Sequence, residues 1–333
     1  MSFQIHIADS DVRFPCAPDE TLLDAALKAG IELPYSCRKG VCGNCAAAVR
    51  GAPVARGVAN AEAVPDGQEL LCQCRPLGDL TIAPGHWRRS EPDARKQLRV
   101  KVFRHTLAAP DVSVLQLRLP TGQRAKFRAG QYLQVRLPDG SRRAYSMANA
   151  PHESDALQLH VRHVPGGQFT QRLASLQAGD ELDVELPFGQ VAIDPAAPTP
   201  LVCVCGGTGF APVKSLLDDL AKRRSTRPVV LVWGSRDRQG LYLHEQVARW
   251  QRSLPGLRFV AAVEDADDAA ALQAFHGRVD AAITTLAIDA ALADVYCCGA
   301  PPMVNAVKAV CLQQLGLAPE RFHSDAFVPG PAA

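Results

Sequence analysis

A short run of cysteines constrains this chain more than any other stretch. Three cysteines follow C-x4-C-x2-C spacing, a fourth comes 26 residues later, and two glycines lie within the run: Cys37, Cys42, Cys45, Cys72, Gly40 and Gly43. This spacing is typical of the thiolate ligands of one class of [2Fe–2S] cluster. The glycines suit a tight loop in which main-chain amides and several thiolates surround one small inorganic core.

Disulfide bonds and a zinc site are the alternatives for the same cysteines. Zinc sites usually combine two short C-x2-C pairs, and the sequence holds no second pair with that spacing. Cys74 stands two residues after Cys72 and competes with it for the place of fourth ligand. Two histidines, His160 and His163, suggest a Rieske-type cluster, but no Cys-x-His pair with the needed partner accompanies them. We therefore do not expect these histidines to be cluster ligands.

Composition narrows the class of protein. The chain has 333 residues, of which 47% are hydrophobic and 21% charged, and its formal net charge is +2. A length of this kind predicts two or three domains. The near-neutral charge argues against nucleic acid or a membrane surface as partner. Eleven cysteines, an odd number, suit a reducing compartment. The N-terminus lacks the features of a signal peptide and no stretch is apolar enough to span a membrane, so we expect a cytoplasmic protein, monomeric or weakly oligomeric.

The pattern of predicted elements changes three times along the chain. Residues 1–85 predict a small α+β module, with a hairpin at 3–7 and 12–16 and a helix opened by a Thr21–Asp24 capping box. Residues 86–96 are polar and predict a linker. Residues 97–197 hold short strands at regular spacing, which favours an antiparallel barrel. In residues 198–333 strands alternate with helices, which predicts an α/β doubly wound parallel sheet.

Four short motifs in the last two segments carry candidate chemistry. Gly206-Gly207-Thr208-Gly209 follows a buried strand and opens a helix, a place where a pyrophosphate can approach the backbone. The others are Arg143-Ala-Tyr145-Ser146 on a barrel strand, Pro165-Gly166-Gly167 with Thr170, and Cys298-Gly299 after a late strand. Alone, each has an ordinary alternative: a tight turn, a half-exposed strand face or a helix cap. Their order along one chain is harder to explain in that way.

In this order the motifs resemble the ferredoxin–NADP reductase family. With the N-terminal cysteine module, the chain is similar to the reductase components of Rieske-type aromatic-ring dioxygenases. The matching segments are residues 145–149, 159–167 and 206–212. The resemblance also favours Cys72 over Cys74, because the family's Leu-x-Cys-Gln ending matches residues 70–73. It implies an NAD(P)H-dependent oxidoreductase with a [2Fe–2S] module, an FAD-binding barrel and a nicotinamide-binding sheet.

The resemblance further implies roles for single residues. Arg143 would pair with the FAD pyrophosphate, Tyr145 would stack on the flavin and Ser146 would hydrogen-bond its N5 atom. The remaining FAD contacts would come from Gly166, Gly167 and Thr170. The coenzyme, NADH or NADPH, would be bound by the other motifs and by one residue further along the chain: Gly206, Gly207, Thr208, Gly209, Arg236, Cys298 and Gly299. Phe327 would pack beside the flavin, and His160 and His163 would be packing or flavin-side residues. Hydride would be transferred beside Cys298, Ser146 and Tyr145. The cluster would be held by Cys37, Cys42, Cys45 and Cys72.

The implied function is electron export. A nicotinamide delivers two electrons as hydride and a cluster accepts one at a time, so the flavin must stand between them. The expected recipient is a terminal Rieske oxygenase, and Arg38 and Lys39 on the cluster loop are candidates for steering it. Alternatives are a diiron monooxygenase or a CDP-6-deoxy-glucoseen dehydratase as recipient, or a redox sensor without turnover. Ser235, Arg236, Asp237 and Arg238 give mixed signals on coenzyme choice.

Overall fold

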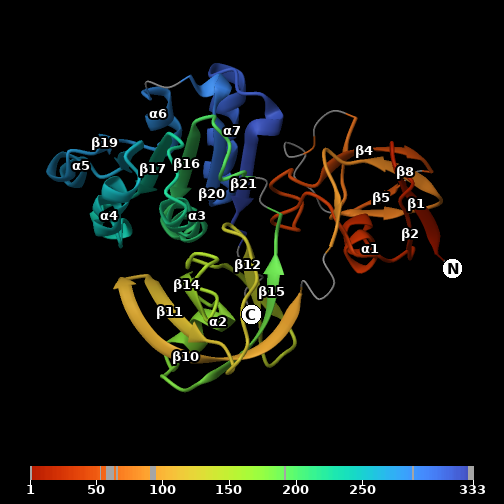
Figure 1. Ribbon diagram of the computed structural model, residues 1–333, viewed down its shortest axis with the longest axis horizontal. Coiled ribbons are helices and arrows are strands. Elements are labelled where there is room, and N and C mark those ends of the chain that lie inside the picture. The colour runs from red at the N-terminus through yellow and green to blue at the C-terminus, as the bar shows by residue number, and fades with distance from the viewer. Residues whose placement is uncertain are drawn as a thin grey trace. The chain divides into compact units, whose positions relative to one another are not determined.

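The chain folds into two compact units, each described here by itself. The computed structural model describes residues 2–52, 54–57, 64, 67–90, 95–190, 193–286 and 289–328. The N-terminal unit holds the described residues up to 90 together with residues 189–190, and the C-terminal unit holds residues 95–188 and 193–328 (Figure 1). No helix within these ranges is long and apolar enough to cross a membrane.

A mixed sheet and one helix form most of the N-terminal unit. The sheet has the order β2-β1-β8-β4-β6. Its strands are β1 (Phe3–Ile7), β2 (Arg13–Cys16), β4 (Ala46–Gly51), β6 (Glu69–Leu70) and β8 (Leu80–Ala83). Two small antiparallel pairs complete the unit, β3 (Ile31–Glu32) with β9 (Arg88–Arg89) and β5 (Val54–Arg56) with β7 (Cys74–Pro76). Strand β9 lies within the stretch that the sequence predicts as a linker.

Helix α1 (Leu22–Lys28) begins at the expected capping box. The Asp24 amide donates to the Thr21 hydroxyl at 3.1 Å, and that hydroxyl donates to the Asp24 carboxylate at 2.8 Å. Leu22 and Leu23 are fully buried against the sheet. Gly30, the residue after the C-cap, has a φ of +71°, which a glycine adopts without strain. The local pattern therefore predicted the start of this helix.

The first half of the C-terminal unit is the antiparallel barrel that the sequence predicts. Its six strands follow the order β13-β12-β15-β10-β11-β14. They are β10 (Lys96–Ala109), β11 (Val112–Arg118), β12 (Tyr132–Arg136), β13 (Arg142–Ser146), β14 (Ala156–Arg162) and β15 (Glu181–Phe188). A bridge between Met147 and Leu159 joins the two ends of the sheet. Helix α2 (Gln168–Leu173) packs into the apolar core through Phe169 and Leu173.

The second half is a parallel sheet with the order β19-β18-β17-β16-β20-β21. Its strands are β16 (Leu201–Gly206), β17 (Val229–Ser235), β18 (Leu257–Val263), β19 (Phe275–His276), β20 (Asp294–Gly299) and β21 (Phe322–Ala326). Helix α3 (Phe210–Lys222) packs on α4 (Glu245–Ser253), and α6 (Val279–Thr284) packs on α7 (Pro301–Ala309) (Figure 1). The chain order reverses at β16, so a crevice opens at the carboxyl ends of β16 and β20.

Four elements of this domain differ from the expectation. The sequence predicts a helix from residue 213 to about 222, whereas helix α3 starts at Phe210, because a 3₁₀ turn over Gly207–Gly209 leads directly into it. Helix α5 (Ala266–Leu272), strand β19 and helix α6 were not predicted. In α5 only Ala269 is buried, so the helix has no apolar stripe that a periodicity argument could detect.

Candidate functional site

The cysteine loop lies between β3 and β4 of the N-terminal unit. Gly40 and Gly43 have φ values of +70° and +79°, so both adopt the left-handed conformation for which glycine is suited. The thiols meet in two pairs, Cys37 with Cys42 and Cys45 with Cys72. Four thiols arranged in this way suit a two-iron core held by two cysteines on each iron.

Within each pair of thiols the pKa values diverge. The Cys42 thiol, together with the main-chain N–H groups of Lys39, Val41 and Cys42, lowers the pKa of Cys37, and the Cys45 thiol, with the Gln73 side chain, lowers the pKa of Cys72. The hydrogen bonds that they donate, and then burial, raise the pKa values of Cys42 and Cys45 well above their usual range. Thiolates are the form that binds iron, so the electrostatics favour that form at one cysteine of each pair.

The second candidate for the fourth ligand, Cys74, belongs to a different environment. Its sulfur lies 3.6 Å from the Glu69 carboxylate, and burial, with a smaller effect of Glu69, raises its pKa to about 12. Cys72 instead pairs with Cys45, and the Gln73 amide lies 3.6 Å from its sulfur. The geometry thus favours the choice that the sequence pattern made.

The two cationic residues of the loop differ in exposure. Lys39 is exposed, whereas the Arg38 side chain is half-buried, pairs with Asp24 of α1 and lies over the Tyr35 ring at 6.0 Å. Arg38 has a φ of +56°, an uncommon value for a residue other than glycine. The expectation that both residues are exposed is therefore wrong for Arg38, because its charge is already paired within the fold.

Strand β13 presents the candidate flavin residues at one edge of the barrel. The Arg143 guanidinium donates to the Gln168 side-chain oxygen at 2.6 Å, which holds it at the start of α2. The Tyr145 ring lies 5.1 Å from the Phe169 ring and is partly exposed, and Ser146 is buried. A cation, an aromatic face and a hydroxyl at alternating and adjacent positions of one strand fit a pyrophosphate and a flavin ring.

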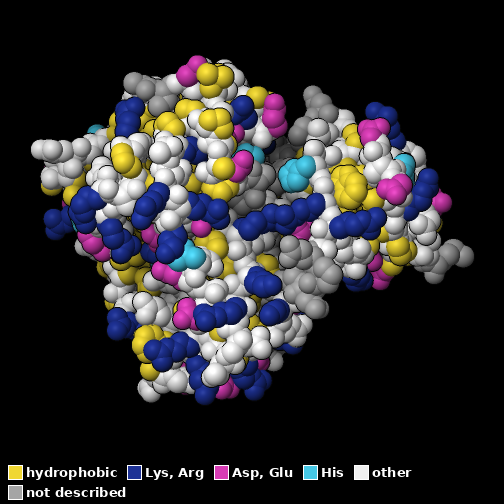
Figure 2. Space-filling model, in the orientation of Figure 1, with side chains coloured by type: hydrophobic (Ala, Val, Ile, Leu, Met, Phe, Trp, Pro, Cys, Tyr) yellow, Lys and Arg dark blue, Asp and Glu magenta, His cyan; other side chains and the backbone are white. Residues whose placement is uncertain are grey.

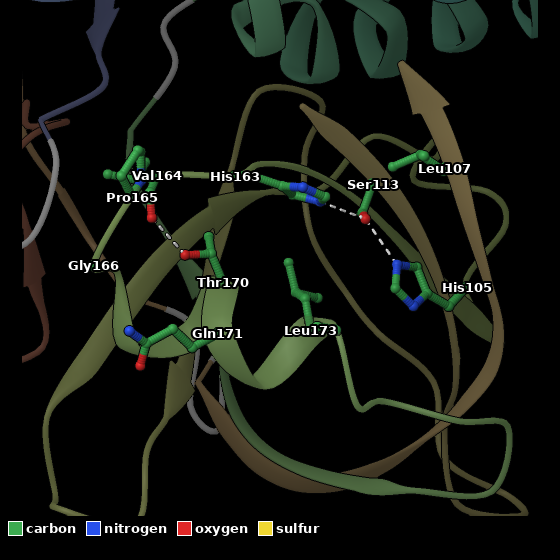
Figure 3. Close-up of a pocket in the computed structure, with 11 residues that line it drawn as sticks. His105, Leu107, Ser113, His163, Val164, Pro165, Gly166, Thr170, Gln171 and Leu173 are labelled. Atoms are coloured by element: carbon green, nitrogen blue, oxygen red, sulfur yellow. Dashed lines mark hydrogen bonds between the residues drawn. The ribbon is translucent and has the colours of Figure 1, made fainter. Parts of the chain in front are cut away.

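The turn that leads into α2 carries the other candidate FAD residues. Gly166 has a φ of +72°, and a Cβ at Gly167 would lie 2.7 Å from the Thr170 hydroxyl oxygen. That hydroxyl lies 2.8 Å from the carbonyl oxygens of both Val164 and Gly167, so it stabilises the turn (Figure 3). The Gly167 amide also donates within the turn, to Val164 O at 2.9 Å.

A cavity of about 490 Å³ borders this turn (Figure 3). It is lined by apolar side chains and by two imidazoles that meet at one serine. The buried Ser113 oxygen lies 2.7 Å from His105 Nε2 and 2.8 Å from His163 Nε2. His105 and Ser113 were missed by the sequence reasoning because nothing in their spacing marks them. Only the pairing of β10 with β11 brings them together.

The glycine motif lies at the crevice of the parallel sheet. Gly207, at φ +52°, lies against the Arg162 guanidinium of the barrel. A Cβ at Gly209 would overlap the Cys298 carbonyl oxygen and lie 2.6 Å from its carbonyl carbon. The start of α3 is thus pressed against the end of β20. Close main-chain approach at a helix N-terminus beside a switch point is the arrangement that binds a dinucleotide pyrophosphate.

Three buried polar groups meet where the barrel and the sheet come together. Cys298 stands opposite Asp325 in the register of β20 and β21, and the Ser146 hydroxyl of the barrel lies 3.5 Å from the Asp325 carboxylate. Burial, and then Asp325, raise the pKa of the Cys298 thiol well above its usual range. The Phe327 amide donates to Gly299 O at 2.8 Å and so fixes the chain beside these groups. The sequence reasoning named all of these segments but missed Asp325 as a site residue.

Further contacts fix the barrel against the sheet. His160 Nδ1 lies 3.0 Å from the Tyr242 hydroxyl oxygen, and burial, with a smaller effect of Lys214, lowers the pKa of His160 to about 3. The Lys214 ammonium donates to Ala148 O at 3.1 Å, and the Ser215 hydroxyl donates to Asn149 O at 2.7 Å. His160 is therefore a neutral residue that packs between the barrel and the sheet.

The end of β17 carries the candidates for coenzyme choice. The Asp237 carboxylate accepts the Gly240 amide at 3.0 Å, and Arg238 lies 3.7 Å from Asp268. Arg236 is exposed and has no ion-pair partner among the described residues. Of these charged groups, Arg236 is the one most available to a ligand.

Charged side chains of both signs are interspersed over the face in Figure 2, in keeping with the net charge of +2.

Three family models cover most of the chain in the expected order. Residues 5–77 match the 2Fe-2S iron-sulfur cluster binding domain, residues 99–193 the oxidoreductase FAD-binding domain and residues 203–309 the oxidoreductase NAD-binding domain. The cofactors are therefore a [2Fe–2S] cluster, FAD and a nicotinamide coenzyme.

Curated relatives match end to end. Reductase components 2 and 1 of terephthalate 1,2-dioxygenase from Comamonas are 52% and 51% identical over 334 residues, with 99% of each chain covered. A CDP-6-deoxy-L-threo-D-glycero-4-hexulose-3-dehydrase reductase from Yersinia pseudotuberculosis is 32% identical, again over 99% of each chain. Among solved structures, the Amycolatopsis cytochrome P450 reductase is 31% identical with a TM-score of 0.78, covering 99% of this chain and 100% of its own.

Proposed function

Because this chain belongs to the family of three-domain iron–sulfur flavin reductases that includes the terephthalate 1,2-dioxygenase reductase components, we propose that it is the reductase of an aromatic-ring dioxygenase. It takes hydride from NADH or NADPH and exports single electrons to a terminal oxygenase. The observation that carries this proposal is the presence, in one chain, of paired thiols, a flavin-binding strand and a dinucleotide crevice, over a length that relatives share from end to end. A sensor without turnover needs no such crevice.

Each part of the chain has a defined task. Bound FAD supplies the conversion from two-electron to one-electron chemistry, and the bound cluster supplies the exit. The turn at residues 206–209 binds the coenzyme pyrophosphate, and Arg236 contacts the adenosine half. Ser146 and Asp325 provide a buried hydroxyl and carboxylate beside the hydride-transfer position, with Cys298 packed against it.

Arg143 offers a direct test of the FAD site. A charge-assisted hydrogen bond is worth about 1.5–3 kcal/mol, so Arg143→Ala is expected to weaken FAD binding by about 10-fold to 100-fold. The variant should retain its iron and sulfide, because the cluster loop lies in the other unit. FAD retention equal to the parent protein would remove Arg143 from the site.

The partner we propose is a Rieske oxygenase, and terephthalate the aromatic substrate of the complete system. Clusters with this ligand spacing have potentials near about −400 mV, and Rieske centres lie at about −150 to +300 mV. A gap of about 250 mV or more favours export by a factor of roughly 10⁴ at 59 mV per decade. The higher identity to the terephthalate components, against 32% for the dehydrase reductase, favours this partner over a deoxysugar dehydratase.

The test begins with the purified protein. Iron, sulfide and flavin analysis should give two iron atoms and one FAD per chain, and rapid mixing with NADH and with NADPH should reduce the flavin and then the cluster. The reduced protein should support product formation by a terephthalate oxygenase and not by a deoxysugar dehydratase. Absence of either cofactor, or no reduction by either coenzyme, would reject the proposal.

A further inference from the structure

Two residues that leave the flavin barrel belong to the N-terminal unit. Strand β15 ends at Phe188, and the next residues, Gly189 and Gln190, group with the cluster-bearing unit. The Gly189 amide donates to the Tyr35 hydroxyl at 3.0 Å, and the Gln190 amide donates to the Tyr35 carbonyl oxygen at 3.0 Å. One tyrosine, 154 positions away in the sequence, therefore binds two consecutive main-chain amides of this segment.

Tyr35 is part of the cluster loop. It stands two residues before Cys37 and its side chain is 2% exposed. Arg38 lies over its ring, and the Gln73 amide donates to Arg38 O at 3.3 Å while approaching the Cys72 sulfur. A displacement of the Tyr35 ring would therefore also displace the segments that carry two of the ligand cysteines, Cys37 and Cys72.

On the other side of the Phe188–Gly189 peptide bond, the chain is equally well fixed. The Phe188 ring stacks on Tyr132 at 5.5 Å with an interplanar angle of 17°, and the Arg95 guanidinium lies 4.3 Å from the Phe188 ring centroid. Tyr132 pairs with Ser146 in the register of β12 and β13. A single peptide bond therefore separates a residue packed behind the flavin strand from a residue bound to the cluster loop.

Gly189 is suited to this place by its conformation. It is buried and has a φ of +87°, where a residue with a Cβ is strained. A buried tyrosine hydroxyl usually finds a hydrogen-bond partner, and here the partner is the main chain of the connecting segment. The conformation of Gly189 and the buried hydroxyl of Tyr35 thus both suit this contact.

We propose that Tyr35 is a positioning residue that clamps residues 189–190 to the cluster loop and thereby governs how efficiently electrons from NAD(P)H pass from the flavin domain to the cluster. This inference rests on the proposed function. The donor is the flavin reduced by the coenzyme, which loses one electron in each transfer, and the acceptor is the oxidised cluster, which gains it. Tyr35 itself is neither oxidised nor reduced.

The first test is hydrogen exchange in the holoprotein, which needs no turnover. Tyr35→Phe keeps the ring and removes the hydroxyl, and a net hydrogen bond corresponds to a factor of about five in an equilibrium constant. The amides of residues 189–190 should exchange about fivefold faster, while those of β1 and β2 are unchanged. Gln190→Ala is the matched control, because it leaves both main-chain donors in place. Equal exchange in Tyr35→Phe and the parent protein would overturn the clamp.

The second test separates the two electron-transfer steps by rapid mixing with coenzyme. Tyr35→Phe should reduce its flavin at the parental rate and its cluster about fivefold more slowly. Gly189→Ala, which retains the Tyr35 hydroxyl but strains the backbone, should show the same split and serves if Tyr35→Phe loses iron. Parental cluster reduction in both variants would overturn the proposal. If the parent protein itself is not reduced by coenzyme, the proposed function fails, and hydrogen exchange still decides whether the clamp exists.

Discussion

Gly209 is where the smallest change to the chain should have the clearest effect on coenzyme binding. Replacing it with alanine places a Cβ 2.6 Å from the Cys298 carbonyl carbon and 3.0 Å from the Gly299 nitrogen, and both neighbours are main chain. Neither can rotate away as a side chain would, so the start of α3 or the end of β20 has to move. Overpacking of this kind costs typically 1–3 kcal/mol, and a clash with main chain belongs at the upper end, about 3 kcal/mol.

Strain of that size appears in one of two measurable ways. A melt followed by circular dichroism should show a Tm lower by about 6–12 °C. Alternatively, the turn shifts in the free variant, and coenzyme binding has to restore its native conformation. Titration with NADH or NADPH should then show that the affinity for the coenzyme is about 100-fold weaker. FAD and iron content should be unchanged. Gly256→Ala, in the turn before β18, is the matched control, since the nearest atom to its added Cβ would lie at 3.4 Å, an ordinary contact. Parental Tm and coenzyme affinity in Gly209→Ala would refute this account of the crevice.

Three further predictions concern other parts of the molecule. Chemical analysis should show that Cys72→Ser loses most of the iron and sulfide, whereas Cys74→Ser retains them. The reverse result would make Cys74 the fourth ligand of the cluster in place of Cys72. The pKa of His160 in the folded protein, about 3, lies below its ordinary value of 6.5, so the unfolded state takes up a proton first and stability falls as pH drops from about 6.5 towards 3. His160→Gln should therefore reduce the stability lost between pH 7 and pH 5 by about 2 kcal/mol in denaturant titrations, and an unchanged loss would assign the acid sensitivity elsewhere. Lys39→Glu should slow electron delivery to the oxygenase at low salt, with the difference shrinking at high salt and flavin reduction unaffected; a salt-independent effect would exclude steering.

The elements that sequence reasoning predicted well are those whose signal is local. The capping box at Thr21 and Asp24 needs only residues three apart, and the positive φ values of Gly40 and Gly43 follow from a loop that has to turn tightly. The strand before Gly206 is a continuous apolar run bounded by glycine, which needs no knowledge of its neighbours. In each case the chain within a few residues determines the geometry.

Polar side chains were predicted less well, because their roles depend on which partners the fold supplies. Arg38 has the same charge as Lys39 and stands beside it, yet Asp24 of α1 takes up its charge. The Thr170 hydroxyl was expected to contact phosphate, and it lies instead against the carbonyl oxygens of the turn. A hydroxyl or guanidinium close to unpaired main-chain or carboxylate groups tends to satisfy them first, since buried polar groups are costly to leave unpaired.

Asp325 shows the limit of motif reasoning at the most important place in the molecule. Its neighbours in sequence drew attention to Phe327, which the family resemblance assigns to the flavin, and nothing local distinguishes Asp325 from any carboxylate near a strand end. The register of β20 and β21 places it opposite Cys298, and the barrel brings Ser146 to within 3.5 Å of its carboxylate. A carboxylate that is 7% exposed is unusual enough to need a reason, and a hydroxyl from a different domain supplies one. The site that we propose for hydride transfer therefore draws on three segments that only the tertiary fold relates, and its acidic member could be recognised only after both domains were in place.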